Sequence, residues 1–170
     1  FVFKFVILGV FFRFAIIIIN EFIPILQFQP DSILYNKTAL LISENFQNNL
    51  PPFAGFNASP SVKSYSFFLA LIYRVFGFKP FVAITVNIIL GVSTSILIYR
   101  ISYLLFLNKR AARIAFLFTL FLPSFIAFNS FILRDTIIMF LTFFLIYRLF
   151  LAVYNINRFY NICVFLVFLP

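Results

Sequence analysis

The sequence contains no histidine and a single cysteine, Cys163. One cysteine cannot form a disulfide within the chain, and without histidine a Cys/His zinc site cannot be built. The same absences exclude Ser-His-Asp and Cys-His catalysis, because both need an imidazole base. Any acid–base chemistry must therefore come from Asp, Glu, Lys or Tyr side chains.

Charge is also scarce in this chain. Charged residues make up 10% and hydrophobic residues 64%, whereas soluble domains contain about 25% charged and about 45–50% apolar residues. This composition favours helices that satisfy their backbone groups internally within lipid. The chain has 4 Asp and Glu against 13 Lys and Arg. Because the basic residues are scattered between apolar runs, they indicate membrane topology, and a nucleic-acid partner is not expected.

The apolar runs predict several membrane spans. We expect complete spans at about 1–19, 81–107, 114–132 and 136–153, and a partial span at 159–170. Lys4 and Arg13 are the weak points of the first span, for which a signal peptide is the alternative, although no small-residue cleavage pattern follows it. Phe1 is not an initiator residue and the last apolar run has barely begun. We therefore expect the N-terminal part of a longer protein.

A polar stretch rich in Pro, Asn, Gln and Ser, residues 20–64, follows the first span and forms a long outer loop. Inside it, a Pro-Asp-Ser helix-start signal precedes apolar residues at helical spacing: Ile33, Leu34, Leu40 and Leu41. This pattern predicts a short helix over 31–46 that lies on the membrane surface. Residues 65–78 are apolar but shorter than the roughly 20 residues of a span, so we expect an interfacial or re-entrant helix there.

The positive-inside rule orients these elements. With the N-terminus inside, the four acids fall on the outer side, and the cytoplasmic side receives seven basic residues: Lys4, Arg100, Lys109, Arg110, Arg113, Arg148 and Arg158. If residues 65–78 crossed the membrane, the basic cluster at 109–113 would face outward. The sequence therefore predicts an all-α, polytopic transmembrane bundle with a long first outer loop that contains a membrane-surface helix.

Asp31 and Asp135 are the candidate catalytic residues, because this topology places both at the outer boundary of the membrane. Acids are costly there unless they are satisfied. If the two carboxylates converge, they could hold a divalent metal ion, or one could act as a general base. Each also has a structural interpretation, Asp31 as a helix N-cap and Asp135 as a complement to a helix dipole.

Three further residues are candidates for substrate binding. Arg134 precedes Asp135, and its guanidinium can donate two parallel hydrogen bonds to a phosphate. The alternative is an arginine that snorkels toward lipid headgroups. Tyr35 and Lys37, close to Asp31 along the chain, are the other two candidates.

Four stretches, taken in order, resemble a known family. They are QPDSILY at 29–35, YSFFLALIYRVFG at 65–77, LPS at 122–124 and FNSFILRD at 128–135. Their arrangement is similar to the N-terminal portion of the GT-C superfamily of membrane glycosyltransferases, near bacterial proteins similar to the protein O-mannosyltransferase and aminoarabinose transferase families. One departure is Ser32, which follows Asp31 where some relatives carry a second acid.

The resemblance implies a chemistry and a place for it. Active-site acids of the first and second outer loops would fall on Asp31 and Asp135, with Asp31 as general base and Asp135 orienting the acceptor or joining a metal site. The sugar donor would be a polyprenyl-phosphate sugar whose phosphate meets Arg134. The acceptor would lie on the outer face of a bacterial plasma membrane, while a need for a divalent cation stays open.

Functions of another class remain as alternatives. The chain could belong to a membrane transporter, to a polysaccharide-export or polymerase component without transferase activity, or to a noncatalytic membrane subunit. Transporters bury polar and ionisable residues near the middle of the bilayer. Here the middles of the expected spans offer little beyond Arg13 and Pro123, which favours chemistry at the membrane surface.

Overall fold

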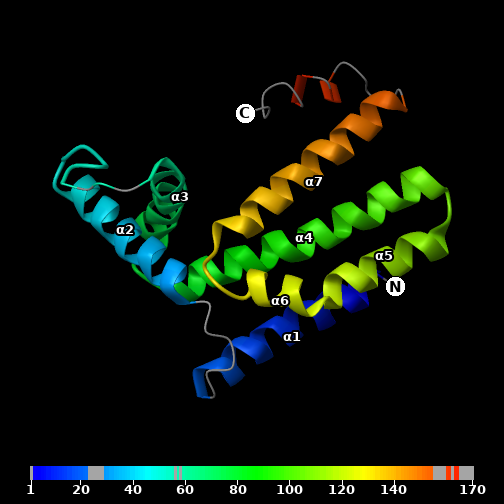
Figure 1. Cartoon of the computed structure of the whole chain (residues 1–170), viewed down its shortest axis with the longest axis horizontal. Coiled ribbons are helices and arrows are strands. Elements are labelled where there is room, and N and C mark those ends of the chain that lie inside the picture. Colours follow the sequence, from blue (N-terminus) through cyan, green and yellow to red (C-terminus); the bar gives the residue numbers. More distant parts are fainter. Residues whose placement is uncertain are drawn as a thin grey trace.

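A computed structural model of the chain describes residues 2–22, 29–55, 57, 59–154, 160, 161, 163 and 164. These residues contain no strand, and seven α-helices are defined among them: α1 Val2–Phe22, α2 Gln29–Gln47, α3 Pro60–Phe76, α4 Pro80–Phe106, α5 Lys109–Phe121, α6 Pro123–Asn129 and α7 Arg134–Val153 (Figure 1). The predicted all-α transmembrane bundle is confirmed. The partial span predicted at 159–170 lies for the most part outside the described residues, as do residues 23–28 of the first loop.

Three helices, α1, α4 and α7, are long and apolar enough to cross a membrane. Their limits agree with the spans predicted at 1–19, 81–107 and 136–153 to within a few residues. The span predicted at 114–132 is occupied by two helices, α5 and α6, which are bent by 56° at a break and are long enough to span only as a pair. Pro123 explains the break, since proline has no N–H to donate and its ring clashes with the preceding turn.

Arg13 crosses from α1 to this break. Its side chain is fully buried, and its Nη1 and Nη2 atoms donate to the carbonyls of Gly9 at 3.0 Å and Leu120 at 3.1 Å. The last carbonyls of a helix lack intrahelical donors, and Arg13 supplies one to the end of α5. The residue that looked like a weak point of an apolar span therefore turns its charge into the bundle, where intramembrane cations are tolerated.

The two ends of the bundle differ in charge. In Figure 1, α2, α3 and the start of α7 lie toward the left, whereas the N-terminal end of α1, the α4–α5 turn and the end of α7 lie toward the right. The left end includes Asp31, Glu44 and Asp135. The elements of the right end carry six basic residues and, among the described residues, no acid: Lys4, Arg100, Lys109, Arg110, Arg113 and Arg148. Basic residues such as Lys37, Lys63 and Arg134 also occur at the left end. The difference between the ends is therefore that the described acids named above lie at the left end and the right end is wholly basic, as the positive-inside rule leads one to expect.

Helices α2 and α3 pack together as a unit at the left end of the bundle (Figure 1). Helix α2 contains the helix predicted over 31–46, and α3 begins at Pro60, earlier than the predicted helix at 65–78. Pro60 suits the first position of α3, where its missing N–H is not needed. Gly77 ends α3 with a φ of 75°, a left-handed conformation that glycine adopts without strain.

The α2–α3 unit shares one core with the start of α4. The hydroxyl of Tyr73 donates to Oδ1 of Asn36, which joins α3 to α2. Ala83 of α4 and Ile132 of the α6–α7 loop complete a buried cluster with the tyrosines and aliphatic side chains of α2 and α3. The loop that leads into α7 is therefore part of the same core as the first outer loop.

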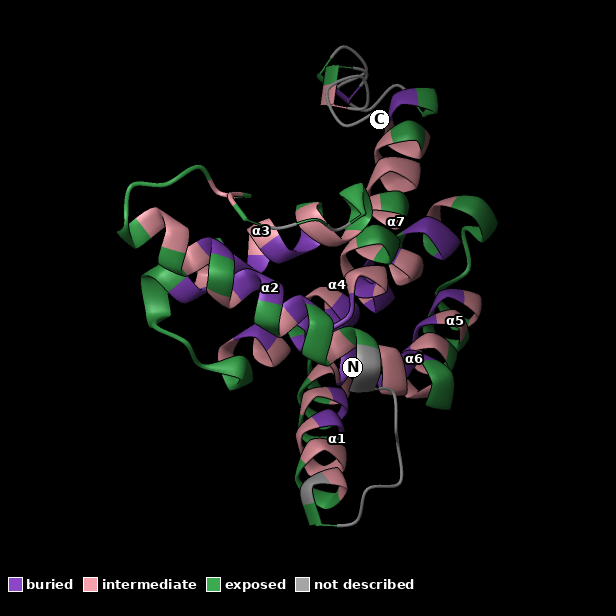
Figure 2. Cartoon of the chain, turned by 60° about the vertical axis from the view of Figure 1, so that its left-hand side comes forward, coloured by how far each residue is buried: buried purple, intermediate pink, exposed green. Residues whose placement is uncertain are grey.

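Helix α4 is the centre of the bundle and packs against both α5 and α7. Its buried residues include small and polar side chains such as Gly91, Thr94 and Ser95, as is common where transmembrane helices approach closely. Figure 2 shows buried segments along α4 and between α2 and α3, and more exposed ones on the outside of α1. Large apolar side chains of α1, for example Phe3 and Phe11, are at least 70% exposed, a surface suited to lipid.

Candidate functional site

Asp31 lies in the first turn of α2, and its side chain is exposed. The helix begins at Gln29, two residues earlier than the sequence pattern indicated. The interpretation of Asp31 as an N-cap is therefore wrong, although a carboxylate in the first turn still interacts favourably with the helix dipole. Tyr35 follows one turn later on the same face of α2 and is buried, with 5% of its surface exposed.

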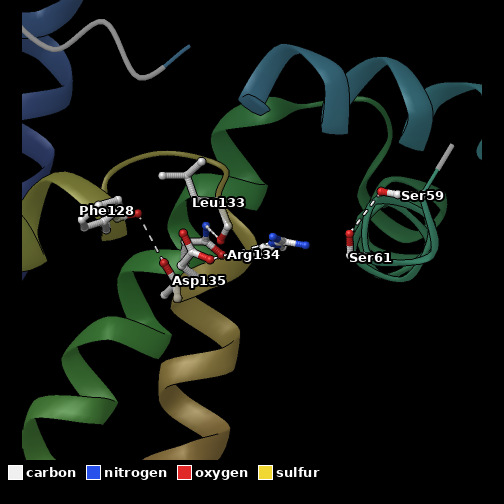
Figure 3. Close-up of polar contacts among 8 residues, drawn as sticks. Ser59, Ser61, Phe128, Leu133, Arg134 and Asp135 are labelled. Atoms are coloured by element: carbon white, nitrogen blue, oxygen red, sulfur yellow. Dashed lines mark hydrogen bonds and ion pairs between the residues drawn. The ribbon is translucent and has the colours of Figure 1, made fainter. Parts of the chain in front are cut away.

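Arg134 and Asp135 occupy the first turn of α7. Arg134 Nε lies 3.9 Å from Asp135 Oδ1, and the two side chains are 40% and 50% exposed, respectively. Figure 3 shows both residues directly after Leu133, where the α6–α7 loop enters α7. The hydroxyl of Thr136 donates to the carbonyl of Phe128 at 3.3 Å, which fastens this turn to the end of α6.

Tyr35 connects these two regions electrostatically. Burial raises the pKa of the Tyr35 hydroxyl above its usual value, the charge of Arg134 acts in the opposite direction, and the charges of Asp31 and Asp135 add to the rise. Charges act on a hydroxyl in this way when they lie near it. Tyr35 and Ile132, three residues before Asp135, also belong to one buried cluster, so the start of α7 lies at the same end of the bundle as α2.

A buried polar network that the sequence analysis missed supports this end of the bundle. Asn87 of α4 is 1% exposed, and its Nδ2 donates to the carbonyls of Phe131 at 2.6 Å and Leu133 at 3.2 Å. The hydroxyl of Tyr65 donates to Asn87 Oδ1 at 3.4 Å. The signal in the sequence was an asparagine inside an otherwise apolar span. A polar residue at such a position is a candidate functional residue by default.

Tyr65 continues the network to α2. Its ring meets that of Tyr35 edge to face, with the ring centroids 4.8 Å apart, an arrangement that aromatic pairs favour. Burial raises the pKa of the Tyr65 hydroxyl well above its usual range, and the bond to Asn87 acts in the opposite direction. The Tyr65 hydroxyl therefore stays protonated and remains a donor.

Lys37 is not part of this group. It lies two residues after Tyr35 on α2, and residues two apart do not share a helix face. Its side chain is exposed at a hollow of about 420 Å³ between α2 and the α3–α4 turn, lined by Ile33, Asn36, Lys37, Leu40, Leu41 and Phe78. Apart from Lys37 and Asn36 the walls are apolar, so the hollow suits a hydrocarbon chain with an anionic head.

The acidic residues of the described chain do not form a metal-binding cluster. Within the described part of the chain, no three acidic or cysteine side chains gather into a group that could hold a metal ion. Asp31 and Asp135 are the two carboxylates that the site neighbourhood contains. Calcium usually takes six to eight oxygen ligands, more than these two residues supply.

Comparison with known proteins identifies the family to which the chain belongs. A family model described as dolichyl-phosphate-mannose-protein mannosyltransferase matches residues 63–168, which include Asn87, Arg134 and Asp135 but not Asp31. No curated protein and no solved structure matches the chain. Because the match covers more than half of the sequence and the helices form a transmembrane bundle, the chain belongs to the dolichyl-phosphate-mannose-protein mannosyltransferase family of GT-C-type membrane glycosyltransferases.

Proposed function

We propose that this protein transfers a sugar from a polyprenyl-phosphate carrier to an acceptor at the membrane face that carries α2, α3 and the start of α7. The observation that carries the proposal is that the loop leading into α7 shares a buried core with α2 and α3. Asp31 on α2 and the Arg134–Asp135 pair on α7 therefore lie at the same end of the bundle, where their side chains are accessible. Such a set can accept a proton and stabilise a leaving phosphate.

The transfer step assigns one role to each residue. The acceptor oxygen attacks the anomeric carbon of the sugar while the bond from that carbon to the carrier phosphate breaks. Asp31 takes the proton of the acceptor hydroxyl, and the phosphate leaves with the bonding electron pair. Arg134 donates hydrogen bonds to the departing phosphate, where positive charge stabilises the transition state most.

Asp135 has a supporting role in this proposal. Its carboxylate holds the Arg134 side chain through the ion pair at 3.9 Å and can accept a hydrogen bond from the acceptor. Tyr35 forms the buried floor of the site beneath these groups. Lys37 and the apolar hollow beside it offer a surface to the carrier, with the hydrocarbon against Ile33, Leu40 and Phe78 and the ammonium group available to an anionic head.

A transporter or a polysaccharide-export component was the alternative from sequence. Two of the buried polar residues inside the bundle, Arg13 and Asn87, bond backbone carbonyls of neighbouring elements, which gives them a structural role. The transferase proposal is therefore the better supported of the two.

The activity can be tested directly. The full-length protein in lipid vesicles should consume radiolabelled polyprenyl-phosphate mannose, release polyprenyl phosphate and pass label to an acceptor fraction from membranes. Vesicles with heat-inactivated protein are the control. If the donor remains intact with mannose and with other sugars on the same carrier, the proposed reaction is wrong.

The orientation of the site is a second expectation. We expect α2 and α3 on the outer face of the plasma membrane and the 109–113 cluster in the cytoplasm, because positive charge is retained inside. In a Cys163→Ser background, Asn57→Cys should react with an impermeant thiol reagent on intact cells, whereas Lys109→Cys should react only after the cells are opened. Labelling at 109 and not at 57 in intact cells would show that the protein has the opposite topology.

A further inference from the structure

Asn87 occupies the junction of three elements of the proposed site. It belongs to α4, its amide reaches the α6–α7 loop that delivers Arg134 and Asp135, and it meets the hydroxyl of Tyr65 on α3. Tyr65 in turn packs against Tyr35, one turn after Asp31 on α2. The amide of Asn87 is thus the shared contact between the part of the chain that carries Asp31 and the part that carries Asp135.

The orientation of the amide follows from its partners. The carbonyl oxygens of Phe131 and Leu133 can accept hydrogen bonds but cannot donate them. The atom that faces both, at 2.6 Å and 3.2 Å, must therefore be the Nδ2 group with its two hydrogens. Oδ1 is left to accept from the Tyr65 hydroxyl, so every hydrogen-bonding group of the amide is used.

The two carbonyls belong to the short segment 131–133, which leads directly into α7. Leu133 is the residue before the first helical position, and its backbone N–H donates to the carbonyl of Phe131 at 3.0 Å. With Asn87 on both carbonyls, the short segment 131–133 is tied at two points directly before Arg134 and Asp135. Ile132, between them, is 2% exposed and belongs to the core shared by α2 and α3.

We propose that Asn87 is a positioning residue of the transferase site, which fixes Arg134 and Asp135 relative to Asp31 by holding the 131–133 segment and the Tyr65–Tyr35 pair together. This inference rests on the proposed function. Asn87 itself touches neither substrate nor reacting atoms, since it is buried beneath the loop. Its contribution is geometric, and a misplacement of about 1 Å in such a site can lower a rate by about 100-fold.

The first test is a double-mutant cycle in the sugar-transfer assay on the full-length protein. Asn87→Ala should lower kcat by about 10- to 100-fold, with a smaller change in KM. In the Asp135→Asn background, Asn87→Ala should lower kcat much less, because effects of residues that act as a unit are not additive. Thr85→Ala is the matched control on α4, since the Thr85 hydroxyl bonds a carbonyl of its own helix at 2.8 Å.

The outcomes separate this inference from the proposed function. If Asp135→Asn and Asp31→Asn keep full activity, the proposed site itself is wrong. If those variants are impaired but Asn87→Ala lowers kcat by the same factor in both backgrounds, Asn87 acts on stability alone and the positioning role is wrong. Equal effects of Asn87→Ala and Thr85→Ala would overturn it as well.

A second readout does not depend on activity. Spin labels can be attached at Ser61→Cys on α3 and Ile138→Cys on α7 in a Cys163→Ser background, because both positions are exposed. The labels report the distance between the two parts of the chain that Asn87 joins. Asn87→Ala should broaden or shift this distance distribution, and Thr85→Ala should not. An unchanged distribution in a folded Asn87→Ala protein would contradict the proposal even if activity fell.

Discussion

Asp31→Asn is expected to lower sugar transfer by about 10²- to 10⁴-fold, the contribution typical of a general base, while expression and folding stay close to those of the parent. The amide keeps the shape of the carboxylate but cannot take the acceptor's proton at neutral pH. Asp31 is exposed in the first turn of α2, so its loss removes no buried contact. The measurement is initial-rate transfer from a polyprenyl-phosphate sugar donor by the full-length protein.

Asp135→Asn should impair the same reaction less, by roughly 10- to 100-fold, because Asp135 orients its partners and does not take the proton. The substitution also removes the ion pair with Arg134 and a favourable interaction with the start of α7, worth about 0.3–1 kcal/mol. Glu44→Gln is the matched control, since Glu44 is an exposed acid near the other end of α2. Parent-like transfer by both Asn variants would show that the two acids are structural.

Gly91→Ala is expected to destabilise the bundle by about 1–3 kcal/mol, the usual range for added volume in a packed core. A Cβ atom at position 91 would lie 2.4 Å from both Cγ and Nδ2 of Asn129 and 2.9 Å from its Cβ. Asn129 is fully buried, and its Cβ is fixed by the backbone of α6, so relief requires α4 and α6 to move apart. The expected observation is a lower midpoint of thermal unfolding in detergent.

Asn129→Ala tests whether that contact is the cause. It removes the Cγ and Nδ2 atoms at 2.4 Å but keeps the Cβ atom at 2.9 Å, so in the double variant the unfolding midpoint should recover only part of what Gly91→Ala loses. Alone it should have a small effect, because the polar atoms of the Asn129 side chain are buried without a partner among the described residues. Ser93→Ala on the same helix is the control. A Gly91→Ala protein as stable as the parent would mean that α4 and α6 are not closely packed.

The candidate site could be predicted in part from single residues. Asp31 and Asp135 were found because acids are rare in this chain and fall next to apolar runs, and Arg134 and Tyr35 lie beside them in sequence. Asn87 and Tyr65 could not be found in the same way. Their importance comes from hydrogen bonds between residues more than 20 positions apart, and no local pattern encodes such pairs.

Arg13 and Pro123 show the same division within the fold. From sequence, Arg13 is a charge in an apolar run and Pro123 is a proline within a span. In the structure the two are connected, because the proline interrupts the helix and the arginine bonds to a carbonyl at the interruption. Neither observation alone predicts the 56° bend or the burial of the charge.

The sequence by itself determined that this is a helical membrane protein and where its apolar helices lie, and it predicted which residues face opposite sides of the membrane. Those properties depend on hydrophobic length and on the position of charge along the chain, both of which are local. Tertiary structure decided how α5 and α6 break, which loop Asn87 holds, and that Asp31, Tyr35, Arg134 and Asp135 lie at the same end of the bundle. Packing between distant helices sets these features, because the close approach at Gly91 and the hydrogen bonds of Asn87 join residues that are far apart in sequence.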